Sequence, residues 1–256
     1  MTMSGTPLSR LCILWIVAPI VLAACARTDR PDPRALSVAE RLRLAAIAES
    51  HGNHDVALSI YRNAAAAAPD HVETQLRFAQ ALAERGATGE AIGVLQGVLA
   101  RRPGDRAVLK ALGRLHLREG AVAEAEAAFR RAAEADPQDA EALNGLGVAA
   151  DLGGNHARAQ GFYRRALQVA PSQVAARNNL ALSLALAGNA AEAERLFEEL
   201  GTAARTDVRV RHTQGLIAAM QGRMAEARRL VAPELDGEAF TEFASAASML
   251  AAAASP

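Results

Sequence analysis

The stretch GAVAEAEAAFRRAAEADPQD, residues 120–139, contains the pattern that decides the fold. It opens with a glycine, has alanine at 125 and phenylalanine at 129, and closes with proline at 137 and aspartate at 139. The glycine returns every 34 residues, as Gly52, Gly86, Gly120, Gly154, Gly188 and Gly222. Five residues after each comes an alanine, namely Ala57, Ala91, Ala125, Ala159, Ala193 and Ala227. A repeat of this length in helix-favouring sequence predicts stacked helical hairpins.

Each residue type in the repeat has a structural purpose. The glycine permits the left-handed conformation that ends a first helix, and the alanine lets the second helix approach closely. Prolines at 69, 103, 137 and 171 end the second helices. Bulky residues are expected between hairpins at Tyr61, Leu95, Phe129, Tyr163 and Phe197, facing small residues at Ala45, Ala79, Gly113, Gly147, Ala181 and Gly215. Asp105, Asp139 and Asp207 are the expected N-caps of following helices.

This 34-residue unit resembles the tetratricopeptide repeat, a helix–turn–helix module. The resemblance implies an all-α, right-handed superhelical solenoid with one concave surface. The six units span 38–71, 72–105, 106–139, 140–173, 174–207 and 208–241, and a C-terminal cap and tail span 242–256. The last units are atypical, because Gly201, Arg205 and Pro233 interrupt the pattern. A final capping helix is expected over Glu238–Ala253.

Composition and charge limit the range of possible functions. The chain has 28 basic and 28 acidic side chains, a balance that disfavours a nucleic-acid partner. With 51% hydrophobic residues it can bury a core, and with only 4% aromatic residues it favours helix over sheet. Lys110 is the only lysine, and the chain contains no Gly-Lys-Ser/Thr triplet of a phosphate-binding loop.

The N-terminal segment has the features of a secretion signal. Arg10 precedes an apolar run over 11–22, which is too short to span a membrane comfortably. Leu22-Ala23-Ala24-Cys25 resembles the lipobox of bacterial lipoproteins. That resemblance implies cleavage of residues 1–24, lipidation of Cys25, and, with Ala26 next, the periplasmic face of the outer membrane. Residues 25–37 then form a lipidated cysteine and flexible tether. An ordinary cleaved signal or an uncleaved anchor, with Cys25 a bystander, is the alternative.

No residue pattern in the sequence strongly indicates a metal site, a nucleotide site or a catalytic nucleophile. His51, His54 and Asp55 flank an inter-helix turn, where polar residues are expected without any metal. Gly145-Leu146-Gly147 resembles the start of a dinucleotide fingerprint, but no strand precedes it. Ser183 has no nucleophile-elbow context. We therefore expect no metal, no cofactor and no enzymatic activity.

The concave surface is the expected binding site, because solenoids use it for partners. Repeat geometry places these side chains there: Arg77, Gln80, Lys110, Arg114, Arg118, Asn144, Asp151, Asn178 and His212. Lys110, Arg114 and Arg118 are four residues apart and form a basic stripe. The alternative is an ordinary solvated helix face. Ala39, Leu42 and Ala46 stand where chaperone-binding repeats carry their carboxylate clamp, so a chaperone C-terminus is disfavoured.

The C-terminal runs 178–188 and 209–212 resemble TadD, a family of lipobox-bearing repeat proteins of the tight-adherence (Flp) pilus assembly machinery. This resemblance implies a non-catalytic outer-membrane lipoprotein that captures a segment of the pilus secretin or another assembly subunit. Thr213-Gln214-Gly215 departs from the family pattern. The competing hypotheses are a pilotin-type lipoprotein of type IV pili and a scaffold that regulates periplasmic cell-wall enzymes.

Overall fold

The computed structural model describes residues 36–200 and 206–254, and all regular structure in these ranges is helical. The predicted signal, Cys25 and nearly all of the tether lie outside the described residues, as do Gly201 and Arg205. The helices are α1 Val38–Ser50, α2 His54–Ala67, α3 Val72–Glu84, α4 Thr88–Arg101, α5 Arg106–Arg118, α6 Val122–Ala135, α7 Ala140–Leu152, α8 His156–Val169, α9 Val174–Leu186, α10 Ala190–Glu198, α12 Val208–Met220, α13 Met224–Val231 and α14 Gly237–Ala254.

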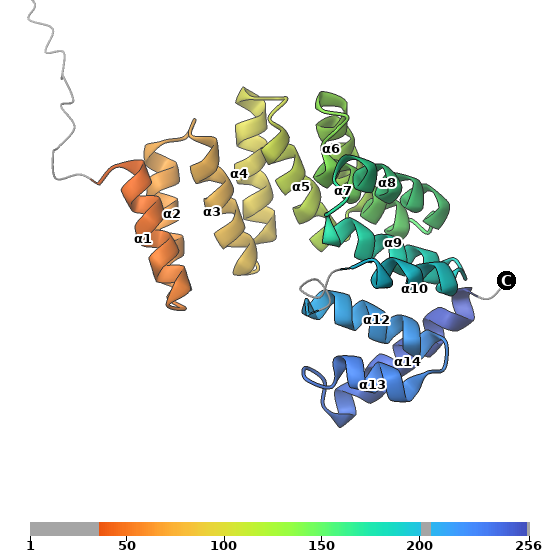
Figure 1. Cartoon of the computed structure of the whole chain (residues 1–256). Helices are drawn as coiled ribbons and strands as arrows, with labels where there is room; N and C mark the ends of the chain where they lie inside the picture. Colours follow the sequence, from red (N-terminus) through yellow and green to blue (C-terminus); the bar gives the residue numbers. More distant parts are fainter. Residues whose placement is uncertain (1–35, 201–205, 255–256) are drawn as a thin grey trace, which may run out of the picture. The chain divides into compact units, whose positions relative to one another are not determined.

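Consecutive helices pack as hairpins, and each hairpin stacks on the next (Figure 1). From the second unit onward, the first helix of a unit contacts its own second helix and also the first helix of the following unit, as α5 does with α6 and α7. This arrangement confirms the predicted all-α repeat solenoid. None of the helices in the described ranges combines the length and apolar character that a membrane span needs.

The turn inside each hairpin depends on the periodic glycine. All six of these glycines have a positive φ, between 72° and 80°. In the first turn the Asn53 amide donates to the Ala48 carbonyl at 2.8 Å, which satisfies an acceptor at the end of α1. Residues with a Cβ rarely adopt this backbone conformation, which explains why glycine recurs at the turn of every unit.

The turn between hairpins is set by proline and an N-cap. Each of α2, α4, α6 and α8 ends two residues before its proline, and the intervening residue takes φ between −132° and −148°. Asp105, Asp139 and Asp207 accept backbone amides of the following helices, as predicted. Ser37 forms a capping box with Glu40 at the start of α1.

The core is a series of hydrophobic clusters between the first and second helices. The six periodic alanines are at most 1% exposed, and the five bulky residues, each four residues after an alanine on the same helix, are at most 4% exposed. An added Cβ at Gly147 would lie 2.3 Å from the Tyr163 ring, and one at Gly145 would lie 2.4 Å from the Phe129 ring. Both glycines of the Gly145-Leu146-Gly147 run therefore serve packing.

The C-terminal end departs from the regular stack. α13 ends at Val231, two residues before Pro233, and α14 extends the predicted capping helix by one residue at each end. α14 crosses the expected boundary at residue 241. It contacts the first helices α12 and α9 as well as α13. Leu216, Ala219 and Met220 pack in the same cluster as Phe240 and Ala247 of α14, so this helix covers groove-side positions of the last unit.

Candidate functional site: a cleft along the first helices

A cleft of about 610 Å³ lies between α3 and α5 and reaches the start of α7. Its walls carry Glu73, Leu76, Arg77, Ala79, Gln80, Ala83 and Glu84 from α3, Ala107, Lys110, Ala111, Arg114, Leu115 and Arg118 from α5, Leu95 from α4, and Glu141 from α7. Five of the nine predicted groove residues therefore line one continuous surface. Its apolar floor and charged rim are typical of a site that binds another molecule.

The predicted basic stripe is present, but most of it is already paired. The Lys110 ammonium lies 2.9 Å from an Asp139 carboxylate oxygen and 2.8 Å from one of Glu141. Arg114 pairs with Glu141, and Arg118 donates to the Ala83 carbonyl at 2.8 Å. The stripe therefore links neighbouring units, and its free positive charge is smaller than the sequence suggests.

The Lys110–Asp139 pair shifts both pKa values. Burial lowers the pKa of Lys110, but hydrogen bonds to Glu141 and Asp139 outweigh burial and hold it above its ordinary value. Burial raises the pKa of Asp139, but hydrogen bonds from the Ala142 amide and Lys110 outweigh burial and hold it below its ordinary value. Both ions are thus stabilised by the fold.

Replacing Lys110 with methionine is expected to lower the free energy of unfolding by about 1–2 kcal/mol at neutral pH. The raised pKa of Lys110 stabilises the fold until pH rises through it, and the lowered pKa of Asp139 stabilises the fold until pH falls through it. The difference between wild type and variant should therefore be flat from about pH 5 to pH 9 and shrink on both sides. Urea unfolding across this pH range measures it.

The control for this prediction is Arg85→Met, which breaks an ion pair with Asp55 whose side chains are 49% and 80% exposed. Because solvent screens that pair, its loss should change the free energy of unfolding by about 0.5 kcal/mol or less. Equal losses in the two variants would contradict a special role for Lys110.

The other predicted groove residues have varied surroundings. Arg77 is exposed and forms no ion pair among the described residues, and Gln80 donates to Glu84 at 2.9 Å. Asn144 accepts from Asn179 at 3.0 Å, whereas the shielded Asn178 side-chain oxygen has no hydrogen-bond partner in the described part of the chain. Further along, His212 lies 3.5 Å from Glu234.

Asp151, another predicted groove residue, contacts three side chains of the fold. Its carboxylate accepts from the Tyr163 hydroxyl at 2.9 Å and the Ser183 hydroxyl at 2.7 Å, and lies 2.8 Å from Nδ1 of His156. Burial, and then the charge of Asp151, raise the pKa of Tyr163. This carboxylate joins two units through these contacts.

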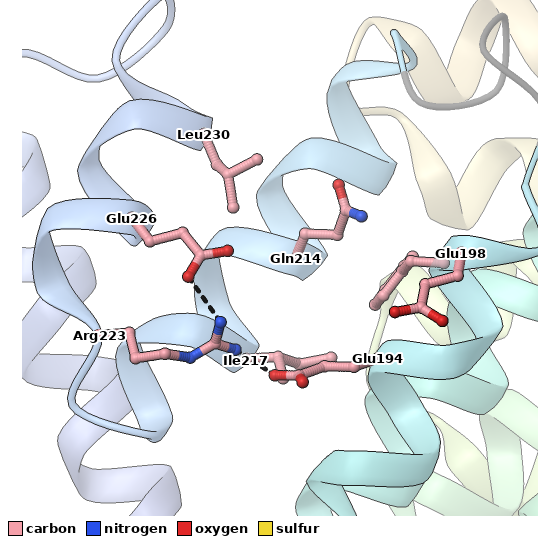
Figure 2. Close-up of a pocket in the computed structure, with 8 residues that line it drawn as sticks. Glu194, Glu198, Gln214, Ile217, Arg223, Glu226 and Leu230 are labelled. Atoms are coloured by element: carbon pink, nitrogen blue, oxygen red, sulfur yellow. Dashed lines mark hydrogen bonds and ion pairs between the residues drawn. The ribbon is translucent and has the colours of Figure 1, made fainter.

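A smaller pocket of about 270 Å³ separates α10 from α12 and α13. Figure 2 shows Arg223 extending between Glu194 of α10 and Glu226 of α13. Its Nη1 lies 2.6 Å from Glu226. Sequence reasoning did not single out this pocket. Arg223 therefore links the last two units through ion pairs at the edge of this pocket.

The described residues contain no cluster of three or more His, Cys, Asp and Glu side chains that could hold a metal ion. His51, one of the three considered residues, instead has Nδ1 within 2.8 Å of the Ile47 carbonyl of its own helix. Asp55 forms the exposed pair with Arg85. The polar turn is therefore explained by local hydrogen bonds and ion pairs.

Comparisons with known proteins agree with this architecture. One family model described as tetratricopeptide repeat matches residues 48–115 and 82–147, and a second matches 154–208. A tetratricopeptide repeat protein of Parabacteroides merdae superposes with a TM-score of 0.70 at 18% identity, over 84% of this chain and 86% of that one. No curated protein sequence matches the chain.

Two further solved structures are similar. A thermophilic repeat protein of Thermus thermophilus gives a TM-score of 0.60 at 19% identity, over 75% of this chain and 98% of that one. MamA of Desulfovibrio magneticus gives a TM-score of 0.54 at 20% identity, over 63% of this chain and 92% of that one. At these identities the likeness concerns the fold alone.

Proposed function

Because the chain belongs to the tetratricopeptide repeat family, whose repeats generally mediate contacts between proteins, we propose that it is a non-catalytic scaffold that captures a protein segment in the cleft between α3 and α5. The observation that carries the proposal is the cleft itself. It combines an apolar floor with exposed charged side chains on the first helices, which solenoid proteins use as their binding surface.

The proposed setting is the periplasmic face of the outer membrane, with the lipid on Cys25 as anchor. The lipobox-like Leu22-Ala23-Ala24-Cys25 supports the anchor, and several acyl chains would hold a protein of this size stably. The TadD-like runs 178–188 and 209–212 support a role in Flp pilus assembly. The partner proposed for the cleft is then a segment of the pilus secretin or of another assembly subunit.

A strain that lacks this protein is expected to lose most of its secretin multimers, because unassembled subunits would lose their anchored scaffold. Wild-type protein should restore them and should incorporate labelled palmitate. Cys25→Ser should incorporate none, leave the outer-membrane fraction and fail to restore the multimers. The readouts are multimer levels on immunoblots, lipid labelling and membrane fractionation.

The matched control is Cys12→Ser, which changes the other cysteine of the chain and should behave as wild type. Unchanged secretin multimers and normal pili in the deletion strain would refute the assembly role. They would leave the pilotin-type and cell-wall scaffold roles as the ones to test. Palmitate labelling that survives Cys25→Ser would refute the anchor.

A further inference from the structure

The face of α1 at the end of the described stack is apolar and uncovered. Residue 7 of a unit, counted from the first residue of that unit, is at most 7% exposed in units two to five. Phe78 shows why, since Arg62 of the preceding hairpin lies 5.8 Å from the centre of its ring. No helix precedes α1 in the part of the chain that the structure describes (Figure 1). Leu44, at residue 7 of unit one, is therefore 43% exposed, and Ile47, at residue 10, is 54% exposed.

Val56 extends this apolar face onto α2. Residue 19 of a unit lies on the side of the preceding unit, as the ion pair of Arg158 in unit four with Glu126 in unit three shows. This residue is charged in every unit except the first. Unit one has Val56 there, and its side chain is 54% exposed. We call Leu44, Ile47 and Val56 the end face.

The two ends of the stack differ in how they meet solvent. α14 packs over the last unit, where Phe240 and Ala247 are buried against it. The described residues provide no such cap for the first unit. End repeats of a solenoid are normally polar on their outer side, because that side faces water. Large apolar side chains grouped on such a side are typical of a surface that contacts another phase or molecule.

We propose that the end face rests on the lipid surface to which Cys25 anchors the chain. The inference rests on the proposed function, because the lipid on Cys25 brings unit one to the bilayer. Twelve residues separate Cys25 from Val38, the first residue of α1, so the chain between them spans at most about 45 Å. Unit one is the unit that follows this short tether, and the cleft between α3 and α5 would then stand one unit away from the membrane.

The size of the end face favours lipid over a protein partner. A stable interface between proteins buries about 800 Å² on each side and involves about 20–30 residues of each partner. Three side chains that are each about half exposed fall far short of this. Docking on the bilayer needs less, because the anchor makes it an intramolecular event in which weak contacts suffice.

The charges beside the end face are compatible with a phospholipid surface. Arg43 is exposed four residues before Ile47, so its guanidinium can reach lipid phosphates while its stem lies along the apolar face. Glu40 is the acid one turn before Leu44. Its carboxylate accepts from the amide and the hydroxyl of Ser37 at 2.8 and 2.7 Å, so it is held at the helix cap.

The test uses the chain 25–256, which contains every described residue, has Cys25 as its single cysteine and has no tryptophan. Its thiol is coupled to a maleimide lipid in phosphatidylcholine vesicles. Ile47→Trp places the single tryptophan on the end face, and Val208→Trp places it at an exposed position of unit six. Lipid with brominated chains should quench the first reporter about twofold or more and shift its emission to the blue, because apolar faces sink about 5–10 Å into the boundary of headgroups and chains. The second reporter should show neither effect.

Two charged variants test the position. Val56→Glu supplies the residue that units two, three, five and six carry at residue 19, and Leu44→Glu places the same charge on α1. In the Ile47→Trp chain each should reduce quenching to the level of Val208→Trp, because a carboxylate resists transfer into lipid. Leu152→Glu adds the charge at a side chain of α7 that is 59% exposed, and should leave quenching unchanged. Quenching that survives both end-face variants would overturn the assignment.

The remaining outcomes identify other occupants of the end face. Equal quenching of the two reporters would show unspecific contact with the vesicle. Emission of Ile47→Trp that is blue-shifted without vesicles would show that a second copy covers the face if the shift grows with protein concentration, or another segment of the chain if it does not. Each of these results would overturn the inference.

The maleimide coupling separates this inference from the proposed function, because it does not require lipidation in a host. Palmitate labelling in cells without quenching on vesicles would overturn the docking of the end face and leave the anchor intact. Quenching on vesicles without palmitate labelling would refute the anchor, and would still support the affinity of the end face for lipid.

Discussion

Replacing Asp151 with alanine is expected to lower the free energy of unfolding by about 2–4 kcal/mol. Three side chains lose their common partner, namely Tyr163, Ser183 and His156. The Tyr163 ring is 1% exposed, so its hydroxyl cannot turn to water without moving the ring. An unsatisfied buried donor is costly, and here the lost acceptor is also charged. Chemical denaturation monitored by circular dichroism measures the loss.

The repeat itself supplies the control for this prediction. Units three and five have phenylalanine at residue 24, and the equivalent of Asp151 in those units is apolar, Leu117 or Ala185. Tyr163→Phe in the Asp151→Ala background should therefore recover part of the lost stability. The double-mutant cycle should give a coupling of about 1–2 kcal/mol. Additive losses would show that the carboxylate and the hydroxyl act independently.

The pairing of Tyr163 with Asp151 was predictable from the sequence. Residue 24 is tyrosine in units one and four, and only those units carry an acid at residue 12, Glu49 and Asp151. The Tyr61 hydroxyl donates to Glu49 at 3.0 Å, as Tyr163 does to Asp151. Burial and Glu49 raise the pKa of Tyr61 to about 12. A comparison of units position by position, rather than a search for exposed polar residues, would have assigned Asp151 to the fold.

The repeat architecture was predictable because each periodic residue acts within its own hairpin or its immediate neighbour. Backbone conformation at glycine, helix ends at proline and close packing at alanine all follow from the residue type alone. The ion pairs of the groove were not predictable in this way. The spacing of Lys110 describes its own helix, whereas its partners Asp139 and Glu141 belong to the cap and first turn of the next unit's helix.

The cleft lies on the concave face that the repeat resemblance implies, but its extent was not predictable from one unit. Its walls come from α3, α5 and the start of α7, and only the stacking of adjacent hairpins brings these helices together.

Gly145→Ala is expected to lower the free energy of unfolding by about 1–3 kcal/mol, although alanine favours helix more than glycine does. The new methyl group would lie 2.4 Å from one edge of the Phe129 ring. The ring has little room to retreat, because it is 2% exposed and its opposite edge packs so closely against Gly113 that a Cβ there would lie 2.7 Å away. Urea denaturation of wild type and variant provides the measurement.

Two further variants decide whether this packing is the cause. Gly161→Ala changes an exposed glycine of α8 with open space around it, and should raise the free energy of unfolding by about 0.5–1 kcal/mol. Phe129→Leu in the Gly145→Ala background recreates the pair of Leu95 and Ala111 found one unit earlier, so it should relieve the clash. If Gly145→Ala instead matches the gain of Gly161→Ala, the Phe129 ring moves away without cost, and close packing does not explain the glycine at this position.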